Sequence, residues 1–243
     1  MQKSSCRILL LIACIALAAP AMAQTLVINT DERFPVSSEQ GDGFLDIIVT
    51  EAFARIGVTI SIVHLPSERA LLNADQGVDD GLFDRIAGID QDYPHLVMVP
   101  EKVNEFEFCA FTSDPDMALA GWEDLKPYNV GMVRGWKMVE NNMPQVTSLV
   151  SVREDFMLFD LLLNGRADVV ILGRLSGMML AKERGLTGIH VVEPPLAVTD
   201  MYVYLHERHA ALVPELARAI RELKDEGFYD QTVARVLGEA GIP

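Results

Sequence analysis

Cysteine is scarce in this sequence, with three in 243 residues. Cys6 and Cys14 lie in an N-terminal segment that we expect to be removed, which leaves Cys109 alone. A single cysteine excludes a disulfide framework and a metal site built from several cysteines. Cys109 lies in the apolar and aromatic run 106–111. We therefore expect it to be a small packed side chain and not a nucleophile.

Positive charge is also scarce, because 20 Lys and Arg residues face 35 Asp and Glu residues, for a formal net charge of −15. Such an acidic chain is a poor match for nucleic acid or for anionic membrane surfaces, so we expect neither as a partner. After residue 23, no apolar run is long enough to cross a bilayer. Half of the residues are hydrophobic, which argues against disorder.

Sequence signatures of catalysis, nucleotide binding and metal binding are missing. The sequence has no G-x-S-x-G, P-loop or G-x-G-x-x-G motif, and residues 206–209 lack the H-E-x-x-H spacing. The acidic pairs Asp79-Asp80 and Glu154-Asp155 are better explained as turns and helix starts than as catalytic carboxylates. We therefore expect a protein that is not an enzyme and that has no cofactor and no metal.

Residues 1–23 have the features of a secretory signal peptide. Two basic residues precede the apolar stretch 8–19, and the A-x-A cleavage site 21–23 follows. We expect cleavage after Ala23 and a periplasmic protein. Residues 11–14 resemble a lipobox, but the apolar run continues past them, which favours a soluble exported protein. An uncleaved anchor is a further alternative, although the run is short for a bilayer.

Apolar strands alternate with helical segments along the mature chain. A first strand is expected at 25–30, then an amphipathic helix closed by Gly57 and a second strand at 58–62. A short helix with Ser67 as its N-cap leads to a buried strand that stops at the charged pair 84–85. Strands that alternate with helices predict a parallel sheet that is covered on both faces.

A second series of strands and helices follows an extended segment at 104–112. Its expected strands lie at 129–133, 146–152, 167–172, 189–192 and 201–205. We expect Glu193-Pro194-Pro195 to interrupt the last two, and two helices to end the chain. The sequence therefore predicts an α/β protein with two lobes. Lobe one is expected at 24–110 and 200–243, and lobe two at 111–199.

This order of elements resembles that of bacterial extracellular solute-binding proteins of family 3, which serve amino-acid ABC importers. The resemblance covers the mature chain and rests on the segments 43–46 (Gly-Phe-Leu-Asp), 80–81 (Asp-Gly), 122–125 (Trp-Glu-Asp-Leu), 130–135 (Val-Gly-Met-Val-Arg-Gly) and 164–170 (Asn-Gly-Arg-Ala-Asp-Val-Val). It implies a two-lobed periplasmic-binding-protein type II fold, in which each lobe is a mostly parallel sheet with helices on both faces. It also implies capture of a small solute between the lobes.

The sequence departs from this family at two charged positions. A T-x-x-R segment, whose arginine grips the carboxylate of an amino acid, is replaced by residues 89–94 (Ile-Asp-Gln-Asp-Tyr-Pro). The family's lobe-two aspartate, which takes the ammonium group, is replaced by Gly173 and Arg174. Amino-acid binding therefore does not carry over, and the sequence leaves an anionic and an amino-acid-like solute open.

Six arginines follow expected strand ends: Arg33, Arg69, Arg85, Arg134, Arg153 and Arg174. In open parallel sheets, ligands bind beyond the carboxyl ends of the strands. A guanidinium group matches a carboxylate or a phosphate in shape and charge, so these positions favour an anionic solute. For each arginine, the alternative is a solvated loop residue.

Arg85 is the strongest candidate, because it ends a strand that is central to lobe one. Asp84 beside it could orient it, or the two could form a purely structural pair. Gly135 would let backbone approach the solute, Trp136 would cover it, and Phe34 would form the opposite wall. The alternatives are plain packing for Trp136 and a loop anchor for Phe34. The predicted site consists of Arg85, Arg69, Arg134, Gly135, Trp136, Phe34, Asp84 and Arg174. We expect Arg85→Ala to abolish binding with little change in the melting temperature.

Three functions remain open from the sequence. The first is a monomeric binding protein that delivers a small, anionic or amino-acid-like solute to an ABC permease. The second is a dehydratase-like enzyme on the same scaffold, with Glu154 or Asp155 as its general acid. The third is a ligand-sensing accessory protein for a membrane receptor.

Overall fold

The computed structural model describes residues 25–242, so the expected signal peptide lies outside the described residues. Within this part of the chain, nine strands join in one sheet. The strands are β1 (Leu26–Thr30), β2 (Ile60–His64), β3 (Gly81–Ile86), β4 (Leu96–Met98), β5 (Asn104–Thr112), β6 (Asn129–Val133), β7 (Ser148–Val152), β8 (Val169–Gly173) and β9 (His190–His206). The α-helices are α1 (Phe44–Arg55), α2 (Ser67–Asp75), α3 (Lys137–Asn142), α4 (Leu158–Leu163), α5 (Arg174–Glu183), α6 (Val213–Asp225) and α7 (Phe228–Ala240).

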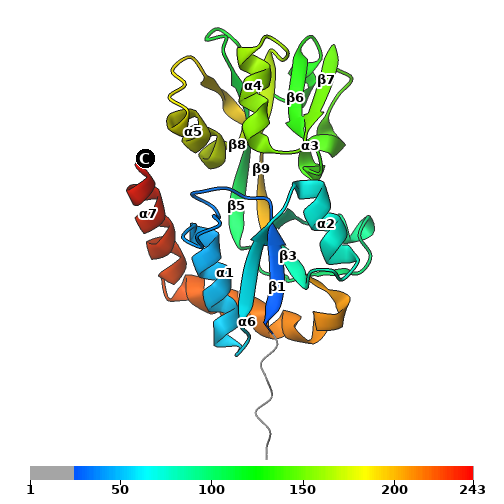
Figure 1. Cartoon of the computed structure of the whole chain (residues 1–243), viewed down its shortest axis with the longest axis vertical. Coiled ribbons are helices and arrows are strands. Elements are labelled where there is room, and N and C mark those ends of the chain that lie inside the picture. The colour runs from blue at the N-terminus through cyan, green and yellow to red at the C-terminus, as the bar shows by residue number, and fades with distance from the viewer. Residues whose placement is uncertain (1–24, 243) are drawn as a thin grey trace, which may run out of the picture.

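The strand order is β2-β1-β3-β9-β5-β8-β6-β7, and β4 pairs with β9. The pairs β1–β2, β1–β3, β6–β7 and β6–β8 are parallel, whereas β5 and β9 pair antiparallel with their neighbours. β5 and β9 run between two parts of the molecule (Figure 1). We call β1–β4 with α1, α2, α6 and α7 the lower half, and β6–β8 with α3–α5 the upper half.

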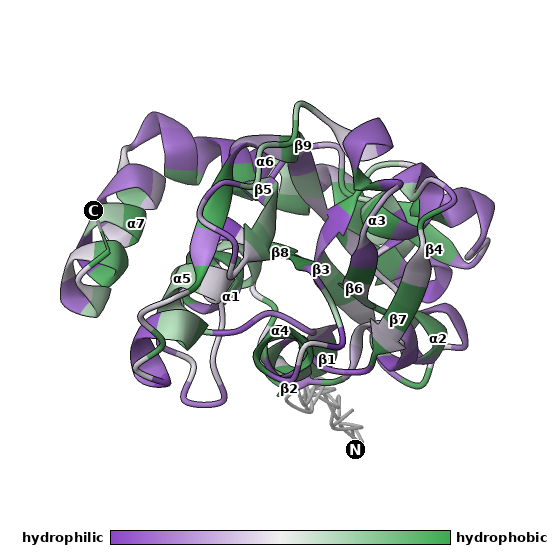
Figure 2. Cartoon of the chain, turned by 90° about the horizontal axis from the view of Figure 1, so that it is seen from above, coloured by the Kyte–Doolittle hydropathy of each residue, from purple (hydrophilic) through white to green (hydrophobic). Residues whose placement is uncertain are grey.

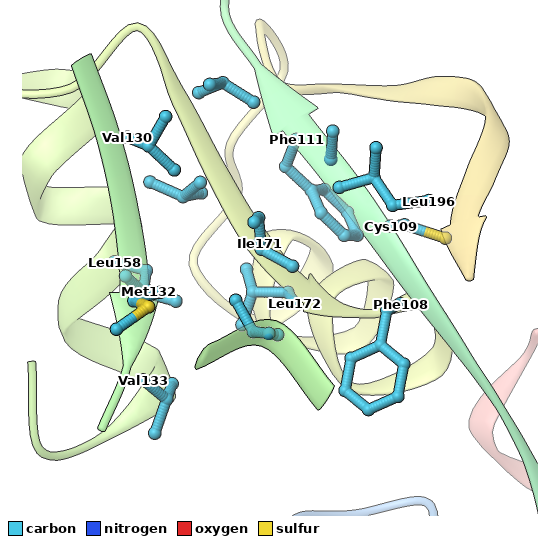
Figure 3. Close-up of a cluster of buried hydrophobic side chains, with 14 of the residues drawn as sticks. Phe108, Cys109, Phe111, Val130, Met132, Val133, Leu158, Ile171, Leu172 and Leu196 are labelled. Atoms are coloured by element: carbon cyan, nitrogen blue, oxygen red, sulfur yellow. The ribbon is translucent and has the colours of Figure 1, made fainter. Parts of the chain in front are cut away.

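Each half has its own hydrophobic core. In the upper half, side chains of β5, β6 and β8 pack together beside α4 (Figure 3). In the lower half, α1 and α6 cover one face of the sheet, and α2 covers a second, smaller cluster. Seen from above, α4 is mostly hydrophobic, whereas α7 alternates hydrophobic and hydrophilic residues (Figure 2). No helix within residues 25–242 is both long and apolar enough to cross a membrane.

The helices follow the sequence pattern that predicts them. In α6, Val213, Leu216, Ile220 and Leu223 recur at helical spacing and are buried. Gly57 follows α1 with a φ of +73°, the left-handed conformation in which glycine ends a helix without strain. The expected alternation of strands and helices is therefore confirmed, with the second strand beginning two residues later than expected.

The expected break in the late strand is wrong. β9 continues from His190 to His206 through Pro194 and Pro195. Its pairing with β5 shifts register there, because Phe108 is opposite Ala197 whereas Ala110 is opposite Val192. Prolines lack an N–H group and are tolerated where a strand bulges away from its partner. The register shift accommodates the two prolines, so one strand passes from the upper to the lower half.

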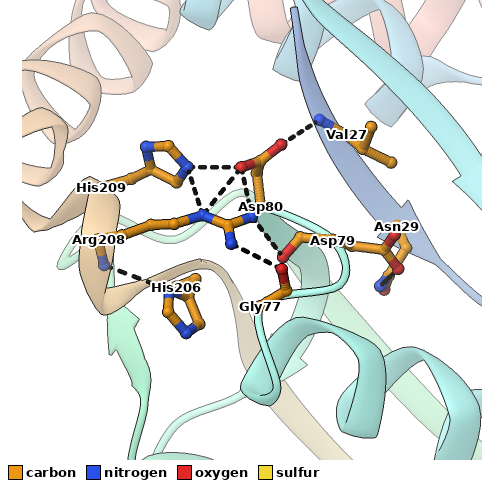
Figure 4. A network of polar contacts seen from close by, with 8 residues as sticks. All are labelled: Val27, Asn29, Gly77, Asp79, Asp80, His206, Arg208 and His209. Carbon is orange, nitrogen blue, oxygen red and sulfur yellow. Dashed lines mark hydrogen bonds and ion pairs between the residues drawn. The ribbon is translucent and has the colours of Figure 1, made fainter.

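Asp80 connects the segment after β9 to β1 through hydrogen bonds (Figure 4). Its carboxylate accepts the Val27 N–H at 2.8 Å, Arg208 Nη2 at 2.6 Å and His209 Nε2 at 2.5 Å. Burial alone would raise the pKa of Asp80, but these donors outweigh it and lower the pKa. Asp79 accepts a hydrogen bond from Asn29 at 2.7 Å. Both aspartates thus hold the chain at a turn, as the sequence indicates.

Candidate functional site

The end of β3 meets the segment after β6 at a cavity between the two halves. This inner cavity is about 20 Å³, roughly the space of one water molecule. Residues of both halves line it, among them Glu32, Asp84 and Arg85 of the lower half and Gly135, Trp136 and Lys137 of the upper half. Four of the eight predicted site residues therefore lie around one cavity.

A larger outer cavity of about 430 Å³ adjoins it, and Glu32 lines both. It lies between the loop after β1, which carries Arg33 and Phe34, and the segment that carries Glu154 and Phe156. A volume of this size is typical of pockets for small molecules. Phe34 lines this outer cavity and not the inner one, and it also packs against the lower core, as a loop anchor does.

Asp84 and Arg85 both face the inner cavity because the end of β3 is irregular. In a regular strand, neighbouring side chains point to opposite faces. Asp84 has a φ of +62°, and the pairing of β3 with β9 shifts register between Leu82 and Arg85. Asp tolerates this left-handed conformation better than most residues. The local geometry thus places an acid and a base side by side at the cavity.

Arg85 is buried and is paired with Asp31, not with Asp84. Its Nη2 lies 2.5 Å from Asp31 Oδ1, and its Nη1 donates to Ser67 Oγ at 3.0 Å. The expected N-cap role of Ser67 is wrong, because Pro66 is the N-cap residue and the hydroxyl serves Arg85 instead. The Nη2–Oδ1 contact is not aligned as a hydrogen bond, and Nε has no hydrogen-bond partner. Arg85 thus keeps donors for a further acceptor.

Asp31 also connects the two halves. Its Oδ2 accepts a hydrogen bond from Trp136 Nε1 at 2.8 Å. The Trp136 ring packs edge-on against Phe106 and Phe108, with 5.8 Å between ring centroids in each pair. Trp136 therefore packs within the upper half and also contacts the lower half, whereas its predicted role in covering the solute stays a prediction.

Gly135 brings the backbones of the two halves close together. Its φ is +91°, and a Cβ atom there would lie 2.5 Å from the backbone nitrogen of Glu68, at the start of α2. Any side chain would collide with that helix, so only glycine fits. The sequence predicts that Gly135 lets backbone approach a solute, whereas in the structure its close neighbour is the start of α2 in the lower half.

Two further carboxyl groups, Glu32 and Asp84, are buried beside this ion pair. Asp84 Oδ2 accepts a hydrogen bond from Asn104 at 3.3 Å, whereas its Oδ1 has no hydrogen-bond partner. Burial raises the pKa of Asp84 to about 7, although Asn104 and Arg85 lower it. Burial, followed by the charge of Asp84, raises the pKa of Glu32 well above its ordinary value.

Asp155 of the upper half forms an ion pair with Arg33 at 3.2 Å. Arg33 also lies over the Phe156 ring, 5.4 Å from its centroid. Burial raises the pKa of Asp155 to about 6, and Arg33 opposes this shift. The halves are thus connected by this ion pair as well as by the Trp136–Asp31 hydrogen bond.

The remaining arginines of the predicted set lie outside these two cavities. Arg69, Arg134 and Arg153 are exposed, and Arg69 donates to Asn73 on its own helix at 2.8 Å. Arg174 forms a bidentate pair with Glu193 at 2.7 and 2.9 Å and a third contact with Glu107. These interactions connect α5 to β5 and β9.

Sequence reasoning missed Asp31, Glu32, Ser67 and Asn104 as site residues. One signal was available, because Asp31 and Glu32 directly follow β1, at the same edge where Arg85 ends β3. Within residues 25–242, no group of three or more His, Cys, Asp or Glu side chains is arranged to hold a metal ion.

Known proteins with this architecture are numerous among solved structures. The substrate-binding protein of an amino-acid ABC transporter has a TM-score of 0.73 and 18% identity, and the match covers 88% of this chain and all of that one. A histidine kinase sensor domain with similarity to periplasmic binding proteins has a TM-score of 0.74 and 18% identity over 88% of this chain and 96% of that one. An amino-acid ABC transporter substrate-binding protein from Streptococcus pneumoniae, bound to L-arginine, has a TM-score of 0.74 and 16% identity over 91% and 97%.

At the level of sequence, an uncharacterized protein of Shewanella oneidensis MR-1 is 27% identical over 195 residues, which are 76% of this chain and 73% of that protein. No family model matches the chain. The structural matches define the fold, which is the two-lobed α/β fold of periplasmic binding proteins, as the sequence predicts.

Proposed function

We propose that this chain is an exported binding protein that holds a small, amino-acid-like solute between its two halves and presents it to an ABC permease. The observation that carries the proposal is a buried cluster of charges of both signs at the contact between the halves. Arg85 keeps an Nε donor without a hydrogen-bond partner there, and Asp84 keeps an acceptor oxygen in the same condition. Buried polar groups are almost always paired, so unpaired ones facing a cavity favour a ligand.

The balance of charge favours an amino-acid-like solute over a purely anionic one. Arg85 faces Asp31, and Arg33 faces Asp155, so each guanidinium has one carboxylate. Glu32 and Asp84 then remain as buried acids. A solute with a carboxylate for Arg85 and an ammonium group for the acids would satisfy both kinds of group. A solute with negative charge alone would meet repulsion from the two acids.

The fold supplies the means of capture. Two halves joined by long strands close around a ligand by a hinge motion, and the partner recognises the closed shape. Contacts from both halves, such as the Trp136–Asp31 hydrogen bond, exist only when the halves are together. Delivery to a permease and location in the periplasm are part of the proposal, and the similar solved structures and the expected signal peptide support them.

Two alternatives have one supporting observation each. The similarity to a histidine kinase sensor domain favours a ligand-sensing protein, and co-purification with a receptor rather than a permease would support it. Asp155, a buried acid whose pKa is raised to about 6, meets one requirement of a dehydratase-like enzyme. Mass spectrometry of the products formed from bound acids tests that alternative.

The proposal is tested by a binding screen on the mature chain. Thermal-shift and calorimetric titrations with amino acids, 2-hydroxy acids and dicarboxylates should identify a solute that raises the melting temperature. Arg85→Lys keeps the charge but loses the planar fork, so we expect it to weaken binding by at least about tenfold. Arg235→Ala, on the exposed face of α7, is the matched control. A folded protein that binds no compound of the panel would refute the proposed function.

A further inference from the structure

Glu32 and Asp84 form a buried carboxyl pair that belongs to the lower half alone. Asp84 is fully buried and Glu32 is 6% exposed. Asp84 Oδ1 has no hydrogen-bond partner, and both side chains line the inner cavity. Burial raises the pKa of both acids, and the neighbouring Arg85 is already paired with Asp31, so one proton remains with the pair.

The charges around the pair come from every element packed against it. The loop after β1 contributes Asp31, and the upper half contributes Asp155, both of which disfavour ionisation of Glu32. Arg85 favours ionisation of both acids but also faces Asp31.

Two neutral side chains and one lysine complete this environment. Asn104 of β5 donates to Asp84. Tyr229 of α7 has its pKa raised, mainly by burial and also by the charge of Asp84. Lys137, on the rim of the inner cavity, lies 2.9 Å from Glu140. The local balance around the acid pair is therefore negative.

We propose that Glu32 and Asp84 receive the amine group of the solute, and that the amine replaces a proton which the two carboxyl groups otherwise share. This inference rests on the proposed function and specifies one end of its ligand. An ammonium group has three donors, and the pair offers acceptor oxygens that are cut off from water. The displaced proton passes to the buffer, and the ammonium group keeps its own protons.

The position of the pair also suits a second contact to the same small molecule. Asp84 and Arg85 are consecutive residues, and both line the inner cavity because of the left-handed conformation at Asp84. An amine held at Asp84 and a carboxylate held at Arg85 are therefore compatible with the dimensions of one amino acid. The acid that takes the amine would thus come from the lower half.

Proton exchange makes binding dependent on pH. Where the unbound pair holds its proton, the amine must displace it, so affinity falls as the pH falls. For one released proton, the change is about tenfold per pH unit below the pKa of the pair. Because burial raises the pKa of Asp84 to about 7, the fall should begin near neutral pH.

The experiment uses the mature chain and each L-amino acid that binds in the screen, together with the 2-hydroxy acid of the same carbon skeleton. Calorimetry in buffers of different ionisation enthalpy counts the protons released. At pH 6.5 we expect release of about one proton with the amino acid. We expect binding of the hydroxy acid to be about 10–100-fold weaker, because a charge-assisted hydrogen bond is lost.

Variants assign the proton to the pair. Asn accepts a positive φ as readily as Asp, so Asp84→Asn preserves the backbone. We expect Asp84→Asn/Glu32→Gln to bind the amino acid without proton release and with little dependence on pH, whereas each single variant retains part of both effects. Asp92→Asn, which changes an exposed acid after β3, is the control and should match the wild type. Thermal melting of each variant in the absence of any compound confirms that the variant folds.

The outcomes separate the two ideas. If hydroxy acids bind as tightly as amino acids, or if the double variant releases as many protons as the wild type, the amine site is refuted while the binding function stands. If no compound of the panel binds to the folded protein, the proposed function fails and the inference falls with it.

Discussion

Arg85→Ala should destabilise the protein even in the absence of a solute. The sequence alone predicts little change in melting temperature, on the view that Arg85 serves a ligand. In the structure, the Arg85 and Asp31 side chains are 7% and 6% exposed and lie 2.5 Å apart. Removal of one partner of a buried ion pair leaves the other charge buried and unpaired, at a cost of about 3–5 kcal/mol.

The lower end of that range applies here. After the substitution, Asp31 still accepts the hydrogen bond from Trp136, and it can also take up a proton. The hydrogen bond from Arg85 to Ser67 is lost as well, at about 1 kcal/mol. We therefore expect a loss of about 3 kcal/mol. For a chain of this size, that corresponds to a fall of roughly 6–12 °C in melting temperature.

Urea unfolding of the solute-free protein, followed by circular dichroism, measures this loss. The matched control is Arg235→Ala, which removes an arginine from an exposed pair with Glu239 and should change the stability by less than about 0.5 kcal/mol. In Arg85→Ala/Asp31→Ala, neither charge is left alone, so the double variant should be more stable than the sum of the single effects by about 1–3 kcal/mol. An Arg85→Ala variant as stable as the control would refute the structural role of the pair.

Two further predictions concern Gly135 and Asp84. Gly135→Ala places a Cβ atom against the backbone of Glu68, so small-angle scattering should show a larger radius of gyration. Gly188→Ala, with open space around it, is the control and should leave the radius unchanged. Equal radii for the two variants would contradict the reasoning. Burial raises the pKa of Asp84 to about 7, so its contribution to stability is present at low pH and is lost as the pH rises from about 4 to about 7. Asp84→Asn should therefore lose less stability than the wild type between pH 5 and pH 8 in urea unfolding, and parallel pH profiles would contradict this.

Much of the fold could be predicted because its signals are local. Hydrophobic periodicity, glycines after helices and apolar runs each act within a dozen residues, and they place most strands and helices correctly. The late strand shows where local reasoning fails. Pro194 and Pro195 are strand breakers taken alone, but the partner strand β5 shifts register and accommodates them. A register shift depends on two strands that are distant in sequence.

In the candidate site, too, local signals predict some features, whereas contacts between distant segments decide the others. The position of Arg85 follows from a general rule about strand ends, and the structure places it at the cavity. Its partner does not follow, because adjacency in sequence favours Asp84, whereas the left-handed backbone at Asp84 directs the pairing to Asp31. Ser67 shows the same effect, because an N-cap preference is local and a buried guanidinium outweighs it.

Asp31 sets a condition on any solute that binds to Arg85. Its carboxylate contacts Arg85 of the lower half and Trp136 of the upper half, which are the contacts that the carboxylate of a solute would make. The inner cavity of about 20 Å³ admits no amino acid while these contacts persist. A solute must therefore displace an internal carboxylate, and its measured affinity reflects only the difference between the two. In the proposed site, a zwitterionic solute also supplies an ammonium group to Glu32 and Asp84, which Asp31 cannot do, so that difference would favour a zwitterion over a simple anion.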